Sequence, residues 1–120
     1  MKRFLLADDN SDLRSALRLM LETRLNAPLV FEADDDVHLI DESLAHHPDC
    51  LILDWELPGF TEHTCLDALR DLLPDLKIIV TSARPEAAVA AAAARADAFI
   101  SKTDPPSEIL NAIHRLNAKD

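Results

Sequence analysis

Short apolar runs alternate with amphipathic stretches along the whole chain. The apolar runs span residues 3–7, 29–33, 50–54, 77–81 and 98–101, and each is too short for an ordinary helix. The stretches that follow them have apolar residues at helical spacing, at about 12–25, 36–46, 62–72, 85–94 and 106–117. Five strands alternating with five helices predict an α/β domain with a parallel sheet that is covered on both faces.

Details of the helices follow from the same pattern. Asn10 or Ser11 is expected to cap the first helix, because both side chains accept hydrogen bonds from free helix amides. Val37, Ile40 and Leu44 are expected to form the inward face of the second helix. The fourth helix is almost entirely alanine, the residue with the highest helix propensity.

Length and charge narrow the class of protein. The 120 residues suit one domain, residues 1–120, and the net charge of −10 argues against direct contact of this domain with nucleic acid or an anionic membrane. The apolar runs are shorter than the roughly 20 residues of a membrane span, and the N-terminus has no signal-peptide pattern. We therefore expect a cytoplasmic protein whose two cysteines, Cys50 and Cys65, are reduced packing residues.

The third apolar run ends on a carboxylate. Cys50-Leu51-Ile52-Leu53 leads into Asp54, and Pro58-Gly59 then interrupts regular structure. Asp54 is thus expected at the carboxyl end of a buried strand, where open α/β sheets place their ligand sites. Charged groups are rarely buried without a partner, so we interpret Asp54 as a site residue. The alternative is a strand-end aspartate that caps a turn.

Other polar residues follow the remaining strands and should meet Asp54 at one edge of the sheet. They are Asp8 and Asp9 after the first strand, Ser82 after the fourth and Lys102 after the fifth. Three converging carboxylates repel one another unless a cation joins them, and an all-oxygen ligand set selects Mg²⁺. Lys102 and Ser82 suit a phosphoryl group. A carboxylate can itself be the nucleophile, and Asp54 at the centre of the sheet is best placed to form an aspartyl phosphate.

Four segments in order carry a family resemblance over the full length of the chain. They are Leu5-Leu6-Ala7-Asp8-Asp9-Asn10, Leu53-Asp54-Trp55-Glu56-Leu57-Pro58-Gly59, Ser82-Ala83 and Phe99-Ile100-Ser101-Lys102. With these segments the chain resembles the receiver domain of bacterial two-component response regulators. The resemblance implies a flavodoxin-like fold with strand order 2-1-3-4-5. It also implies a domain that is not a conventional enzyme, but a phosphoacceptor that assists its own phosphoryl transfer and dephosphorylation.

The resemblance further implies roles for single residues. Asp54 would accept a phosphoryl group from the phosphohistidine of a sensor histidine kinase or phosphotransfer protein. Mg²⁺ would be bound by Asp9, Asp54 and the backbone carbonyl of Glu56, with Asp8 acting through water. Ser82 matches the hydroxyl that moves toward the phosphoryl group, although the adjacent Thr81 is an alternative.

Phe99 matches the family's switch aromatic on the fifth strand, and it can equally be a core residue. Without a phenol oxygen, any rotation of this ring would depend on packing alone.

Several residues depart from the family pattern. Gly59 is the only glycine, and Arg95 stands near the position before the last strand where receivers carry glycine. A positive φ at Arg95 would be strained, so we expect that turn to be remodelled. Thr103 follows Lys102 where proline is common, and we expect a trans bond there because a cis bond costs about 3 kcal/mol without proline.

Glu56 and Arg84 lie two residues beyond Asp54 and Ser82, at positions that flank the phosphoryl group in this family. We expect the two charges to pair across the mouth of the site and to change the rate of autodephosphorylation. Two separate solvated charges are the alternative.

Two other functions compete with a phosphorylation switch. A phosphatase of the haloacid dehalogenase type uses similar residues, but its nucleophile lies on the first strand and it has a cap domain. A degenerate receiver would act only as a protein-interaction module; the complete set of Asp8, Asp9, Asp54, Ser82 and Lys102 opposes this. A homodimer would use the fourth helix with the fifth strand and helix, or the first and last helices. The output and the cognate kinase are not encoded in a readable motif.

Overall fold

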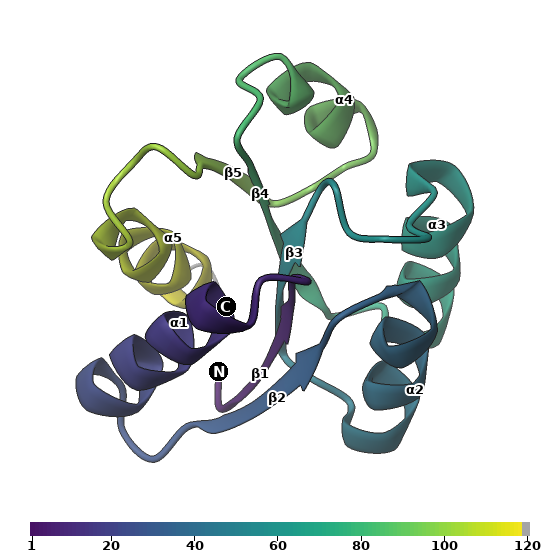
Figure 1. Ribbon diagram of the computed structural model, residues 1–120. Coiled ribbons are helices and arrows are strands. Elements are labelled where there is room, and N and C mark those ends of the chain that lie inside the picture. Colours follow the sequence, from purple (N-terminus) through teal and green to yellow (C-terminus); the bar gives the residue numbers. More distant parts are fainter. Residues whose placement is uncertain (119–120) are drawn as a thin grey trace.

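The computed structural model describes residues 1–118, without the side chains of residues 62–65, so the prediction for Cys65 lies outside the described part. Strands and helices alternate along the chain (Figure 1). They are β1 (Arg3–Ala7), α1 (Ser11–Arg24), β2 (Leu29–Ala33), α2 (Asp36–His46), β3 (Cys50–Asp54), α3 (Glu62–Leu72), β4 (Lys77–Ser82), α4 (Ala87–Ala93), β5 (Ala98–Ser101) and α5 (Ser107–Ala118).

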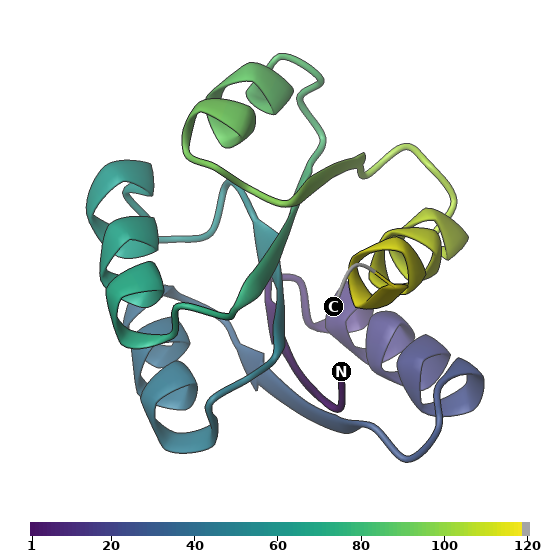
Figure 2. The same cartoon turned by 180° about the vertical axis from the view of Figure 1, so that it is seen from behind.

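The strands form one parallel sheet in the order β2-β1-β3-β4-β5, which confirms the predicted flavodoxin-like α/β fold. Helices α1 and α5 cover one face, and α2 and α3 cover the other, with α4 beside β4 and β5 (Figures 1 and 2). Strand β3 is buried along its whole length, because it lies at the centre of the sheet with helices on both sides. All carboxyl ends of the strands therefore meet along one edge, as the sequence predicted.

Side chains alternate between the two faces of the sheet. On β3, Leu51 and Leu53 belong to the core under α2, α3 and α4, whereas Cys50 and Ile52 belong to the core under α1 and α5. The free thiol of Cys50 is fully buried, which confirms its role in packing, and burial raises its pKa to about 12. None of the helices within residues 1–118 has both the length and the apolar character needed to cross a bilayer.

The observed helices begin and end within about two residues of the ends predicted from the sequence. Asn10 caps α1, since its side chain accepts a hydrogen bond from the Leu13 amide at 3.1 Å. Helix α4 is shorter than expected, and Pro85 precedes it. Strand β4 continues one residue further than predicted, to Ser82.

The prediction for the inward face of α2 was right for Ile40, which packs against the core, and wrong for Val37 and Leu44. Val37 is 60% exposed and Leu44 is 46% exposed, and the buried residues are Leu39 and Ser43. The start of α2 explains the difference, because Asp35 caps the helix and the Asp36 amide donates to the Pro58 carbonyl at 3.1 Å. These contacts fix the rotation of the helix so that Leu39 faces the sheet.

The turn between α4 and β5 keeps its left-handed residue. Arg95 has φ of 65°, so the expected remodelling was wrong. The Arg95 amide donates to Ala92 and the Ala96 amide to Ala91, which is the Schellman pattern that ends many helices. The Arg70 guanidinium also donates to the Arg95 carbonyl. These contacts hold a conformation that usually requires glycine. All peptide bonds among the described residues are trans.

Candidate functional site

Three carboxylates meet where β1 and β3 end. Asp8 and Asp54 are 4% and 3% exposed, and each follows or ends one of two neighbouring strands. Asp9 is exposed beside them, and ligand oxygens of all three lie within 4.8 Å of one another. The structure therefore brings together the carboxylates that the sequence predicted at this edge.

Lys102 joins two of these carboxylates. Its Nζ lies 2.9 Å from Asp8 Oδ2 and 3.2 Å from Asp54 Oδ2. Burial lowers the pKa of Lys102. The hydrogen bond to Asp8 and the charges of both carboxylates raise this pKa by a larger amount, so the net shift is upward. Lys102 is thus held as an ammonium in contact with both buried acids.

Backbone amides hold the other oxygen of each buried carboxylate. The Asn10 amide donates to Asp8 Oδ1 at 2.9 Å, and the Glu56 amide donates to Asp54 Oδ1 at 3.0 Å. Burial raises the pKa of Asp54, the nearby charge of Asp8 adds to that rise, and the Glu56 amide and Lys102 oppose it. Both side chains therefore have fixed orientations at the end of the sheet.

Arg14 on α1 also supports the site, and sequence reasoning missed it. Its Nη1 donates to the Asp8 carbonyl at 2.6 Å, and its Nε donates to Glu32 Oε1 at 2.9 Å. Arg18, one turn later, also donates to Glu32, at 2.9 Å. The spacing of Arg14 and Arg18 was visible in the sequence, but the contact with Asp8 depends on how α1 packs against β1 and β2.

The donor set fits a hard divalent cation. Asp8, Asp9 and Asp54 offer only carboxylate oxygens, and this chemistry favours Mg²⁺ over metals that prefer nitrogen or sulfur ligands. Glu56, whose carbonyl was also predicted to bind the ion, lies in a turn closed by the Leu57 amide on the Asp54 carbonyl at 3.1 Å.

The hydroxyl of Ser82 is bound to Glu56. Ser82 is fully buried, and its Oγ donates to the Glu56 carboxylate, with distances of 2.8 and 2.9 Å to the two oxygens. Arg84 completes this group: its amide donates to Ser82 Oγ at 3.0 Å, and its Nη2 lies 3.2 Å from Glu56 Oε2. The expected pairing of Glu56 and Arg84 is therefore confirmed.

Thr81 and Ser82 lie in different surroundings. Thr81 pairs with Asp54 in the register of β3 and β4, and its Oγ1 lies 3.5 Å from the Leu53 carbonyl. It faces a small hollow of about 60 Å³ whose lining includes Lys102. Ser82 lies on the opposite face of the sheet from Thr81, at the carboxyl end of β4.

Phe99 on β5 shares a sheet face with Ser82. The register pairs Val80 with Phe99 and Ser82 with Ser101, so Phe99 lies two residues back along the sheet from Ser82, on the same face. The ring is half-buried and packs against the core under α2, α3 and α4. Both expectations for Phe99, as core and as the aromatic beside the hydroxyl, agree with this position.

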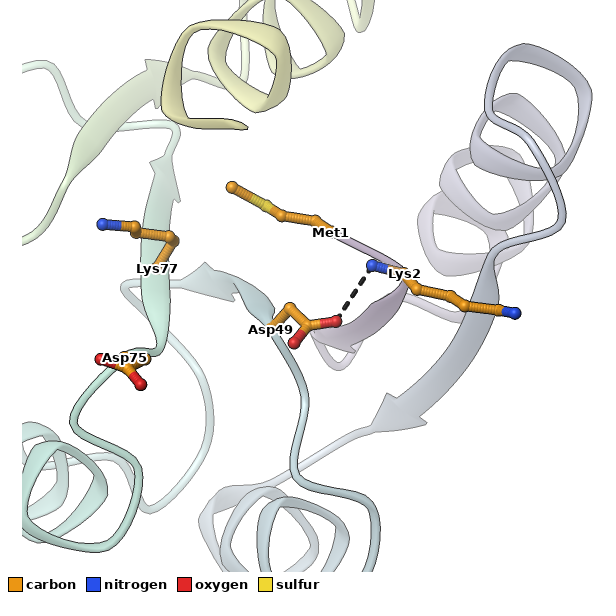
Figure 3. A pocket seen from close by; sticks show the side chains of 5 residues that line it. All are labelled: Met1, Lys2, Asp49, Asp75 and Lys77. Carbon is orange, nitrogen blue, oxygen red and sulfur yellow. Dashed lines mark hydrogen bonds between the residues drawn. The ribbon is translucent and has the colours of Figure 1, made fainter. Parts of the chain in front are cut away.

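A wider hollow lies at the opposite edge of the sheet. It has a volume of about 570 Å³ and is lined by Met1, Lys2, Asp49, Asp75 and Lys77 (Figure 3). Asp49 accepts hydrogen bonds from the Lys2 and Arg3 amides at 3.0 and 2.9 Å, which ties the start of β1 to the start of β3. The Asp49 carboxylate serves this structural tie, and the carboxylate cluster at the other edge remains the candidate site.

Comparison with known proteins agrees with the geometry. A family model for the response regulator receiver domain matches residues 4–114. The Fimbriae Z protein of Salmonella typhimurium is 30% identical over 111 residues, which cover 91% of this chain and 53% of that protein.

Solved structures are similar in fold. A LuxR-family two-component response regulator from Aurantimonas is 25% identical, with a TM-score of 0.86 over 98% of this chain and 85% of that one. The response regulator protein TrrA from Thermotoga maritima, in complex with Mg²⁺ and BeF, is 24% identical, with a TM-score of 0.83 over 97% of this chain and 99% of that one. The chain spans about half the length of the curated relatives that it matches.

Proposed function

The chain belongs to the response regulator receiver domain family of two-component systems, and on this premise we propose that it is a phosphorylation switch in which Asp54 is the phosphoacceptor. One observation carries the proposal. Asp54 is a buried carboxylate at the end of the central strand, and it shares the Lys102 ammonium with Asp8 at 3.2 and 2.9 Å.

The transfer uses groups that the fold already orients. An Asp54 carboxylate oxygen forms the new bond to phosphorus, while the phosphorus–nitrogen bond of a phosphohistidine donor breaks. The released electron pair stays on the donor imidazole, which takes up a proton. Lys102 remains an ammonium beside Asp54 and offers charge to the phosphoryl oxygens. The Glu56 amide holds Oδ1 of Asp54, which leaves Oδ2, the oxygen in contact with Lys102, to change partners.

Mg²⁺ is the cofactor that the donor set supports. Asp9 and Asp54, with Asp8 and the Glu56 carbonyl, would hold it, and when bound it offsets the charge that gathers on the carboxylates and the phosphoryl oxygens. Arg14 and the Asn10 amide keep Asp8 in place for this role.

Ser82 is the hydroxyl that we assign to the phosphorylated state. It lies at the carboxyl end of β4, and its current partner, Glu56, is bonded through its amide to Asp54. Thr81 lies instead on the face covered by α1 and α5, where its Oγ1 is near the Leu53 carbonyl. Phe99 on β5 lies behind Ser82, and its ring is the one that would move when Ser82 moves.

The partners follow from the chemistry of the switch. A sensor histidine kinase or a phosphotransfer protein supplies the phosphoryl group, and the phosphorylated domain acts through another protein or a second copy of itself. Matched relatives include the nitrate/nitrite response regulator NarL, of which this chain covers 54%. We propose that this chain likewise serves as the receiver of a response regulator whose output is carried by residues other than those matched here. We propose a cytoplasmic switch, because response regulators are typically cytoplasmic.

The competing functions are not favoured. A haloacid dehalogenase-type phosphatase places its nucleophile on the first strand, whereas Asp54 is on the third, and the family match covers residues 4–114. A degenerate receiver would not need Lys102 in contact with both Asp8 and Asp54, and the structure has these two contacts.

Intact-mass spectrometry after incubation with acetyl phosphate tests the proposal. We expect a gain of one phosphoryl group that requires Mg²⁺ and is absent in Asp54→Asn. Asp49→Asn is the matched control, because Asp49 lies at the opposite edge of the sheet, where it binds the Lys2 and Arg3 amides. No gain in the native chain at any Mg²⁺ concentration would refute the proposed function.

A further inference from the structure

The Ser82 hydroxyl has a single proton to donate, and it donates this proton in a hydrogen bond to the Glu56 carboxylate. The two Glu56 oxygens lie 2.8 and 2.9 Å from Ser82 Oγ, while the Arg84 amide occupies an acceptor position on the same oxygen at 3.0 Å. Ser82 is fully buried, whereas the Glu56 and Arg84 side chains are 36% and 56% exposed. Glu56 and Arg84 therefore cover the hydroxyl from the solvent side.

We propose that Glu56 is an autoinhibitory latch, which keeps Ser82 from reaching a phosphoryl group on Asp54 until the Glu56 side chain swings away. This inference rests on the proposed function of Asp54. A hydroxyl that donates to Glu56 cannot donate to a phosphoryl oxygen at the same time. The domain must therefore break the Ser82–Glu56 bond before it can form the contact that stabilises its phosphorylated state.

Glu56 is well placed to couple this release to the site. Its backbone amide donates to Asp54 Oδ1 at 3.0 Å, so its main chain is tied to the phosphoacceptor while its side chain is tied to Ser82. Arg84 strengthens the closed arrangement by pairing with Glu56 Oε2 at 3.2 Å. The latch thus has three parts, Ser82, Glu56 and Arg84, and it closes over the end of β4.

The latch sets the population of the competent state. If only a fraction of molecules has a free Ser82 hydroxyl, the apparent affinity for a phosphoryl mimic falls by that fraction. A hydrogen bond to a charged group shifts an equilibrium by about tenfold to a hundredfold. We therefore expect Glu56→Gln, which keeps the shape but removes the charge and the Arg84 ion pair, to raise the apparent affinity for BeF₃⁻ by about tenfold.

Simple charge repulsion makes a different prediction. Removing Glu56 also removes a negative charge near an anionic ligand, which would favour binding without any latch. Arg84→Ala separates the two explanations. If charge alone matters, loss of this positive charge should weaken the binding of the anion BeF₃⁻, whereas loss of a latch partner should tighten it. The Ser82→Ala background separates them again, since the latch acts only through the Ser82 hydroxyl.

The first experiment measures the contact itself, without ligand or metal. Urea unfolding of the native chain, Glu56→Ala, Ser82→Ala and the double variant forms a double-mutant cycle. We expect the two changes to be coupled, with a non-additive factor of about tenfold in the unfolding equilibrium constant. Additive effects would overturn the latch whatever the function of Asp54 is.

The second experiment titrates BeF₃⁻ with Mg²⁺ present and follows the fluorescence of Trp55, the only tryptophan, which adjoins Asp54. Bound BeF₃⁻ is confirmed by ¹⁹F NMR. Glu56→Gln and Arg84→Ala should bind more tightly than the native chain, and the Glu56→Gln gain should vanish in the Ser82→Ala background. Glu86→Gln, which removes an exposed acid near Arg84, is the control and should match the native chain.

These binding measurements distinguish a failure of the proposed function from a failure of the latch. If the native chain and all variants bind no BeF₃⁻, the proposed function is wrong, and the latch as a control on phosphorylation falls with it. If the native chain binds and Glu56→Gln binds equally well, or if its gain persists without Ser82, the phosphoacceptor stands and the latch is refuted.

Discussion

The ammonium nitrogen of Lys102 lies 3.2 Å from Oδ2 of Asp54. The same nitrogen contacts Asp8, so one cation faces two buried carboxylates that would otherwise repel each other. This arrangement couples the stability of the fold to the chemistry of the site, and it makes the consequences of removing Lys102 dependent on Mg²⁺.

Lys102→Met keeps the volume of the side chain and removes its charge. Because buried charges that lose their partner cost about 3–5 kcal/mol, we expect the free energy of unfolding in EDTA to fall by about 3 kcal/mol. Mg²⁺ should restore much of this loss, since it binds the folded site preferentially. Urea unfolding with and without Mg²⁺ measures both effects.

Lys2→Met is the matched control for that experiment. Lys2 lies at the opposite edge of the sheet, beside Asp49 (Figure 3), and its loss should change stability little and equally in EDTA and Mg²⁺. If Lys102→Met lost the same amount in both conditions, Lys102 would not be balancing the charge of a cation site.

Arg14 is expected to act on Mg²⁺ binding through Asp8. Its Nη1 donates to the Asp8 carbonyl at 2.6 Å, and outer partners of metal ligands typically change metal affinity by about tenfold or more. We expect Arg14→Gln to weaken Mg²⁺ binding by about tenfold, as measured by Trp55 fluorescence. Arg18→Gln also loses a contact with Glu32 but does not touch Asp8, and it should keep the native affinity. Equal losses in both variants would contradict this role.

His38 should titrate above its usual range. Its Nδ1 lies 2.9 Å from Oδ1 of both Asp35 and Asp34, and the charge of Asp35, then that of Asp34, raises the pKa of His38 above 6.5. The stabilisation is fully present below pH 6.5 and is lost as the pH rises through the raised pKa. An NMR titration of the His38 ring measures the shift directly.

Replacing the two acids tests the cause of that shift. Asparagine at positions 34 and 35 keeps the helix cap of α2 but removes both charges, and the pKa of His38 should then fall toward 6.5. A His38 pKa that is the same in the native chain and in this variant would show that the carboxylates do not cause the shift.

Arg95→Gly should stabilise the fold. Arg95 has φ of 65°, and a side chain in this region costs about 1–2 kcal/mol. Glycine removes this cost in the folded state, but the greater conformational entropy of the unfolded chain offsets part of the gain. We expect a net gain of about 0.5–1 kcal/mol in the free energy of unfolding. Ala92→Gly, in the last turn of α4, should instead destabilise by about 1 kcal/mol. A loss of stability in Arg95→Gly would mean that the Arg95 side chain matters more than its backbone.

The sequence was sufficient for features that depend on local pattern. Apolar runs marked every strand, Asn10 marked the start of α1, and the parallel topology then brought Asp8, Asp54 and Lys102 to one edge. Each of these follows from a period, a cap or the common direction of parallel strands.

Other features depend on contacts between distant elements. The rotation of α2 follows from the Asp36 amide on the Pro58 carbonyl, and the left-handed Arg95 follows from the hydrogen bonds that end α4 together with Arg70. The binding of Ser82 by Glu56 depends on side-chain torsions across two strands. No periodicity in the sequence reports such contacts.

The central claim is that Asp54 itself carries the phosphoryl group, and its most direct test is chemical. After incubation with acetyl phosphate and Mg²⁺, borohydride reduces an acyl phosphate to an alcohol, which would convert the modified aspartate to homoserine. Tandem mass spectrometry of the digested chain should find homoserine at position 54 alone, and only when Mg²⁺ was present. Homoserine at Asp8 or Asp9, or at no position despite a phosphoryl donor and Mg²⁺, would contradict the account.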